Sequence, residues 1–126
     1  MSTEKNKEVV RRVFEEVMNQ GNLRAVDELV ADDYTLTDPP GLPPGREGLR
    51  ALANMYRTGA PDLHMTVEDV VAEGDQAVAR WVATGTLTGE MMGMPPTGKK
   101  VSFRAISWFR LKNGRIAEEW TQFKAS

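Results

Sequence analysis

Gln76–Thr88 (QAVARWVATGTLT), Val101–Lys112 (VSFRAISWFRLK) and Arg115–Phe123 (RIAEEWTQF) decide the fold of this chain. All three segments are rich in β-branched and aromatic residues, which favour the pleated, half-buried surface of a strand. Asn113-Gly114 joins the last two and predicts a type I′ hairpin turn, because both central residues of that turn need positive φ. Strands of about a dozen residues are long, so the sequence predicts an antiparallel sheet that bends strongly.

The rest of the chain adds three helices and two further strands. The helices are recognised by apolar residues three and four positions apart, and the strands by alternation. Gly21 is expected to end the first helix, and Asn22 to act as the N-cap of the second. Helices followed by a strand meander are typical of an α+β fold, with the helices on one face of the sheet. The expected helices are Glu4–Gln20, Leu23–Val30 and Arg46–Thr58, and the expected strands are Tyr34–Thr37 and Leu63–Glu73.

Composition narrows the possible functions. A chain of 126 residues fits a single domain, 1–126, and no apolar run approaches the roughly 20 residues that span a bilayer. The polar N-terminus does not resemble a secretory signal, so we expect a cytoplasmic protein without a membrane partner. There is no cysteine and only one histidine, His64, so we expect no metal and no cofactor. The net charge of −2, with both signs interleaved, predicts no nucleic-acid partner.

A curved sheet covered by helices forms a cone with an apolar interior, which is the usual place for a small-molecule site. The loop Gly89–Lys99 (GEMMGMPPTGK) is expected at the rim of this cone. Its residues Met91 and Met94 supply adaptable apolar surface, and they fit equally well as a cover for the end of the core. Tyr56 and Leu87 are further expected lining residues.

Several motifs resemble those of the SnoaL-like polyketide cyclases, a family of the NTF2-like superfamily that is similar in fold to ketosteroid isomerase. They are Asp38-Pro39, PGREGL at 44–49, PPTGK at 95–99 and GRIAEEW at 114–120. The resemblance covers nearly the whole chain. It implies an NTF2-like cone, with three N-terminal helices on a strongly curved, mainly antiparallel sheet. It also implies a homodimer formed through the sheet and a small hydrophobic molecule as the ligand.

The polyketide cyclases of this family resemble one another in closing a ring by aldol condensation without a cofactor. In them an aspartate removes the proton beside a carbonyl group, and a histidine assists at the oxyanion. The places of their polar residues hold Thr37, Leu87, Thr121 and Lys124 here. Two functions therefore stay open: a cofactor-free cyclase or isomerase acting on a hydrophobic carbonyl compound, and a non-catalytic ligand-binding or accessory protein that keeps the cavity.

A base for proton abstraction needs a carboxylate whose pKa lies near neutrality and which reaches the substrate. Asp38 is the first candidate, because it ends a strand that should point into the mouth of the cone. Alternatively, its side chain caps the Pro-Pro-Gly turn. Glu119 is the second candidate. The relatives that this chain resembles often carry an aspartate at the place of Thr121, where it looks like a cavity residue. Thr121 shares a face with Glu119, so the resemblance would turn Glu119 inward as well.

Side chains alternate along a strand, so one of Glu118 and Glu119 faces the cavity and the other the far side of the sheet, and the sequence leaves open which. The resemblance implies that Glu119 is the inward one and Glu118 the outward one. We expect Glu118 to form an ion pair with Arg80 or Arg104. Tyr34 and Thr121 are the expected hydrogen-bond donors beside the base. Trp108 and Trp120 are candidates for stacking on a planar ligand, although aromatic residues in strands also fit a core or a dimer interface.

Overall fold

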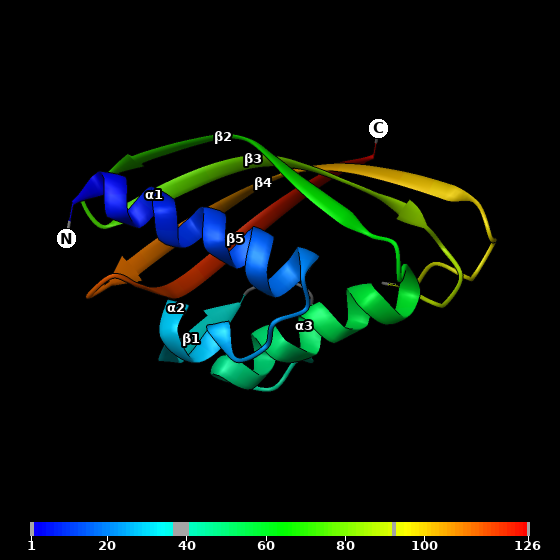
Figure 1. Ribbon diagram of the computed structural model, residues 1–126, viewed down its shortest axis with the longest axis horizontal. Coiled ribbons are helices and arrows are strands. Elements are labelled where there is room, and N and C mark those ends of the chain that lie inside the picture. The colour runs from blue at the N-terminus through cyan, green and yellow to red at the C-terminus, as the bar shows by residue number, and fades with distance from the viewer. Residues whose placement is uncertain (1, 37–40, 92, 126) are drawn as a thin grey trace.

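Four helical segments cover one face of a curved, unclosed sheet in this computed structural model, which describes residues 2–36, 41–91 and 93–125 (Figure 1). The helices are α1 (Thr3–Arg12), η1 (Val13–Asn19), α2 (Ala25–Leu29) and α3 (Arg46–Gly59). The strands are β1 (Val30–Leu36), β2 (His64–Glu73), β3 (Gln76–Thr86), β4 (Lys100–Lys112) and β5 (Arg115–Ala125). The predicted α+β class and the predicted helices on one face of the sheet are confirmed.

The sheet has the order β1-β5-β4-β3-β2. Strands β2 to β5 form the predicted antiparallel meander, and β1 lies parallel to β5 at the edge. Asn113 and Gly114 have φ of 53° and 78°, so the predicted turn is confirmed. β1 begins at Val30, directly after α2 and earlier than predicted, because Val30 already pairs with Ile116 of β5.

The first helix is not α-helical throughout. After Arg12 it continues as the π-helix η1, in which the N–H of Gln20 donates to the oxygen of Glu15, five residues back, at 3.0 Å. The prediction of one α-helix is therefore wrong in its second half. A wider turn brings residues four apart more nearly into line, so more of them can face the sheet at once. The residues buried in this way are Val13, Phe14, Val17 and Met18.

The second helix is shorter than predicted. α2 begins at Ala25, and Asn22 makes no side-chain cap to it among the described residues; its backbone oxygen instead accepts from Ala25 N–H at 3.2 Å. Gly21 ends the preceding helix with φ of 71°, in the left-handed region that glycine favours, as predicted. The Asn19 side chain then joins this helix to the edge of β2, since it donates to Met65 O at 2.8 Å and accepts from Met65 N–H at 2.7 Å.

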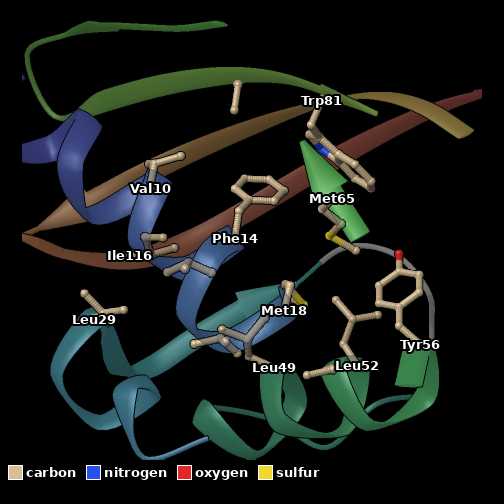
Figure 2. Close-up of a cluster of buried hydrophobic side chains, with 14 of the residues drawn as sticks. Val10, Phe14, Met18, Leu29, Leu49, Leu52, Tyr56, Met65, Trp81 and Ile116 are labelled. Atoms are coloured by element: carbon tan, nitrogen blue, oxygen red, sulfur yellow. The ribbon is translucent and has the colours of Figure 1, made fainter. Parts of the chain in front are cut away.

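The core lies between the helices and the inner face of the sheet (Figure 2). Phe14 of η1 packs against Trp81 of β3 at a ring distance of 5.5 Å, and against Phe109 of β4 at 6.2 Å. Leu52 and Tyr56 of α3 close the core from the other side. Aromatic side chains of this size dominate the apolar area buried in a small protein. The protein's own side chains thus occupy this part of the cone.

The C-terminal end of α3 packs closely on the Gly89–Lys99 loop. The N–H groups of Thr88 and Gly89 both donate to Gly59 O, at 2.9 and 3.0 Å. A Cβ atom on Gly59 would lie 2.5 Å from Met91 Cβ, closer than real Cβ contacts allow. Met91 is accordingly buried against this helix end, where it covers the end of the core.

Gly59→Ala should therefore destabilise the protein by about 1–3 kcal/mol, because the loop has to move away from the added methyl group. Urea unfolding followed by circular dichroism measures this change. Thr58→Ala is the matched control, since Thr58 is the preceding, exposed residue of the same helix. Equal stability of the two variants would contradict the close contact.

Candidate active site

Glu119 is a buried carboxyl group on the inner face of β5. Its residue is only 8% exposed, whereas Glu118 is half-buried on the opposite face of the sheet. The sequence left open which of the two glutamates faces inward, and the structure shows the orientation of Glu119 that the resemblance implied. A bulge in β5 sets this orientation: the pairing changes from Leu111–Ile116 to Arg110–Glu118 and leaves Ala117 as an extra residue.

Glu118 forms an ion pair, but not with the predicted partners. Arg110 Nε lies 2.5 Å from Glu118 Oε1, because these two residues are direct cross-strand neighbours. Arg80 and Arg104 instead approach Glu68 on β2, at 3.4 and 3.6 Å. The prediction of Arg80 or Arg104 is wrong, because Arg104 lies opposite Lys124 on β5 and Arg80 lies on β3, which does not neighbour β5.

Two hydroxyl groups donate to the Glu119 carboxyl group. Tyr34 Oη donates to Oε1 at 2.8 Å, and Thr121 Oγ1 donates to Oε2 at 3.1 Å. Tyr34 is fixed from both ends, since its backbone oxygen accepts from Gly45 N–H at 3.1 Å. The parallel pairing of β1 with β5 brings Tyr34 within reach of Glu119. Both predicted donors thus lie beside this carboxyl group.

A hydrogen-bond chain continues from Thr121 across the sheet. Thr121 Oγ1 lies 2.8 Å from Ser107 Oγ on β4, its direct cross-strand neighbour. Trp81 Nε1 of β3 donates to the same Ser107 oxygen at 2.8 Å. We call Trp81, Ser107, Thr121 and Glu119 the hydrogen-bond chain. Sequence reasoning missed Ser107; the available signal was a serine between Ala105 and Phe109 at an inward position.

Burial raises the pKa of Glu119 above its usual value, and the hydrogen bonds from Tyr34 and Thr121 oppose that effect. Burial, and secondarily the Glu119 charge, also raise the pKa of Tyr34 and of Tyr56. Both phenols therefore remain protonated donors at neutral pH. A carboxylate whose pKa is shifted toward neutrality by an apolar environment is a typical arrangement for a general base.

The other predicted apolar lining residues lie at different depths. Tyr56 of α3 lies close enough to Glu119 to sense its charge. Leu87 and Met91 are buried in the same core, but Leu87 follows the end of β3, far along that strand from Ala77, the residue in line with Glu119. Met94 is partly buried, and its backbone exchanges hydrogen bonds with Met91 at 2.9 and 3.1 Å.

Trp108 and Trp120 do not belong to this site. They are direct cross-strand neighbours on the outer face of the sheet, 48% and 44% exposed. Side chains alternate along a strand, so the inward orientation of Glu119 and Thr121 turns Trp120 outward. Stacking on a ligand bound at Glu119 therefore does not fit their position, whereas the alternative of an interface does.

Asp38 and Thr37 lie outside the described residues. Within residues 2–36, 41–91 and 93–125, no group of three or more His, Cys, Asp or Glu side chains is arranged to hold a metal ion. In the same part of the chain, none of the helices combines the length and apolar character needed to cross a bilayer.

Tyr34 also lines a hollow of about 150 Å³ between β1 and the start of α3. Its walls include Leu36, Leu42 and Pro43. Pockets for organic ligands usually measure about 300–1,000 Å³. Glu119 is not one of the residues that line this hollow. The expected ligand cavity stays a prediction.

The curved sheet with helices on one face places the protein among the NTF2-like α+β proteins. The family model of the SnoaL-like polyketide cyclases matches residues 8–125. The chain belongs to this family, and the predicted resemblance is confirmed. A comparison with curated proteins finds no match.

Three solved structures illustrate the similarity. TsrD from Streptomyces laurentii is 27% identical with a TM-score of 0.90, and the match covers 98% of this chain and 91% of TsrD. IdmH from Streptomyces antibioticus, a candidate polyketide cyclase, is 34% identical with a TM-score of 0.78, covering 94% and 91%. A candidate SnoaL-like polyketide cyclase from Jannaschia sp. CCS1 is 26% identical with a TM-score of 0.85, covering 97% and 87%.

The raised pKa of Glu119 predicts a specific pH dependence of stability. The unfolded chain releases this proton at lower pH than the folded protein does, so the wild type loses stability as pH rises through that window. Glu119→Gln lacks the ionisation, so its stability relative to wild type should improve as pH rises from about 4 to about 8. Urea unfolding at several pH values measures the difference. Glu118→Gln is the matched control, and a pH-independent difference for Glu119→Gln would contradict the raised pKa.

Proposed function

We propose that the protein is a cofactor-independent cyclase or isomerase that removes a proton beside the carbonyl group of a small hydrophobic molecule, with Glu119 as the base. The observation that carries this proposal is the buried Glu119 carboxyl group, held by two hydroxyl donors in an apolar interior. In the proposed step the substrate C–H bond breaks and its proton binds to Glu119. The electron pair moves onto the carbonyl oxygen, which gives an enolate.

Tyr56 is suited to stabilise that enolate. Burial keeps its phenol protonated, and its hydroxyl forms no hydrogen bond with another side chain in the described part of the chain. Tyr34 and Thr121, the donors expected from sequence, are both directed at Glu119 instead. A donor in a water-poor site is worth much more to a developing oxyanion than the same donor in water. Family membership and the similarity to IdmH agree with this kind of substrate.

The second candidate function is ligand binding without turnover. One observation favours it: His64, the only histidine of the chain, is exposed at the start of β2 and lies on the edge strand opposite β1. No imidazole is therefore available near Glu119. Leu87 is a buried apolar residue. Many of the relatives that this chain resembles carry a histidine at this place.

Deuterium exchange separates the two functions. In D₂O the wild type should accelerate the exchange of the α-protons of α-tetralone, or of a 3-ketosteroid, for deuterium. Proton NMR measures the rate of this exchange. Glu119→Gln should lower that rate by about 100-fold or more, because it removes the base. Tyr56→Phe should lower it by about tenfold or more, because it removes the oxyanion donor. Glu118→Gln, on the outer face, should leave the rate unchanged.

Three outcomes would change the assignment. Binding of these compounds without exchange would favour the ligand-binding function. Loss of exchange in Asp38→Asn but not in Glu119→Gln would transfer the role of base to Asp38. Equal rates for Glu118→Gln and Glu119→Gln would contradict Glu119 as the base.

We further propose that the protein forms a homodimer through the outer face of its sheet. Large apolar side chains in line across four strands support this: Val71, Val78, Trp108 and Trp120 pair in succession. Val71 and Trp108 are 58% and 48% exposed, and they border a hollow of about 370 Å³. Exposed apolar patches of this kind usually mark interaction surfaces, and one self-complementary patch suffices for a twofold dimer.

Trp108→Glu should convert that dimer into a monomer, because it places a charge in the centre of the apolar patch. Sedimentation equilibrium measures the mass in solution. Thr58→Glu, on the helical side of the molecule, is the control and should remain dimeric. A wild type that sediments as a monomer would contradict the proposed dimer.

A further inference from the structure

Trp81 and Ser107 are buried polar residues that the proposed reaction does not yet use. Trp81 is 3% exposed, and Ser107 is fully buried. The indole N–H of Trp81 donates to Ser107 Oγ at 2.8 Å, and Ser107 Oγ lies 2.8 Å from Thr121 Oγ1. Trp81 is also fixed by its neighbours, because its ring packs against Phe14 and, edge-on, against Phe123 at 5.9 Å. These contacts leave the hydrogen-bond chain little freedom to rearrange.

The direction of the hydrogen-bond chain follows from the chemistry of its members. An indole nitrogen can only donate, so Ser107 accepts from Trp81. Thr121 is the side-chain acceptor within reach of the Ser107 hydroxyl among the described residues. Ser107 therefore donates to Thr121, since a buried hydroxyl proton without an acceptor is unfavourable. Thr121 in turn donates to Glu119 Oε2. Every donor proton of the hydrogen-bond chain therefore has an acceptor only if the bonds run from Trp81 through Ser107 and Thr121 to Glu119.

The two oxygens of Glu119 then differ. Oε2 faces a Thr121 proton whose direction is fixed by two further residues, so protonation of Oε2 would break the chain. Oε1 faces the Tyr34 hydroxyl, which can rotate about its single C–O bond because no further side chain of the described residues is bonded to it. Oε1 can therefore bind a proton while the hydrogen-bond chain stays intact.

We propose that Trp81 and Ser107 are positioning residues for the proton abstraction: through Thr121 they hold Oε2 as a hydrogen-bond acceptor, so that Glu119 takes the substrate proton at Oε1. This inference rests on the proposed function of Glu119 as base. In the step, the C–H bond breaks, an O–H bond forms at Oε1, and the electron pair moves onto the carbonyl oxygen. The same proton is available for return to the product.

Burial raises the pKa of Glu119, and the hydrogen bonds from Tyr34 and Thr121 lower it. The titratable groups that face Glu119 are Tyr34 from β1 and Tyr56 from α3, and both phenols stay protonated at neutral pH. From β4, Phe109 lies directly opposite Glu119, and Phe14 of η1 packs on Phe109. A titration observed at Glu119 therefore belongs to this carboxyl group.

The test follows that titration directly, in the full chain without substrate. Protein labelled with ¹³C at the glutamate side-chain carboxyl carbons is titrated by NMR, and the Glu119 signal is assigned by its absence in Glu119→Gln. Ser107→Ala removes the hydrogen bond that orients the Thr121 hydroxyl toward Oε2, so Thr121 stabilises the charged carboxylate less well. The midpoint of the Glu119 titration should then rise by roughly half a pH unit or more. Trp81→Phe should raise the midpoint as well. Ser107→Thr keeps the hydroxyl group, so its midpoint should equal that of the wild type.

The outcomes separate the two proposals. A merely structural role would lower the melting temperature of Ser107→Ala and leave the midpoint unmoved, and that result would overturn the positioning role. In the exchange assay, the acidic limb of the pH profile should move with the NMR midpoint. A shifted midpoint with no exchange in the wild type would reject Glu119 as base but keep the directed hydrogen-bond chain. Loss of exchange in Glu119→Gln with no shift in either variant would keep the base and reject Trp81 and Ser107 as positioning residues.

Discussion

The burial of one carboxyl group in an apolar layer is the constraint on which the site depends. A buried charge is costly unless hydrogen bonds compensate for the lost water. Glu119 receives that compensation from Tyr34 and Thr121. Thr121 is its neighbour on β5, but Tyr34 comes from β1, the single strand that runs parallel to its neighbour in the described sheet. The pairing of β1 with β5 is therefore as important for this carboxyl group as for the sheet.

The bulge in β5 decides which glutamate is inside. Because side chains alternate along a strand, a shift of one residue would exchange Glu118 and Glu119 between the two faces. The extra residue at Ala117 lets Ile116 fill the core while Glu118 still faces Arg110 on the outside. The bulge interrupts the pairing of β4 with β5 locally, and it allows both a packed core and an inward carboxyl group.

The same strands present buried polar side chains on the inner face of the sheet and exposed aromatic side chains on its outer face. On the inner face of β4 and β5, Ser107 and Thr121 continue the hydrogen-bond chain from Trp81 to Glu119. On the outer face of the same strands, Trp108 and Trp120 pair and remain exposed. Alternation at these positions couples the two surfaces, because an inward Ser107 or Thr121 turns the adjacent tryptophan outward.

The sequence by itself determined the long strands, the Asn113-Gly114 turn and the helix at Arg46, because these follow from local alternation, turn chemistry and helical spacing. It also indicated Glu119, Tyr34 and Thr121. Only the tertiary structure decided the π-helical turn at Val13–Asn19, the Arg110 partner of Glu118 and the role of Ser107 beside Trp81. These features depend on register and on contacts between residues far apart in the chain, and a local pattern carries no information about such contacts.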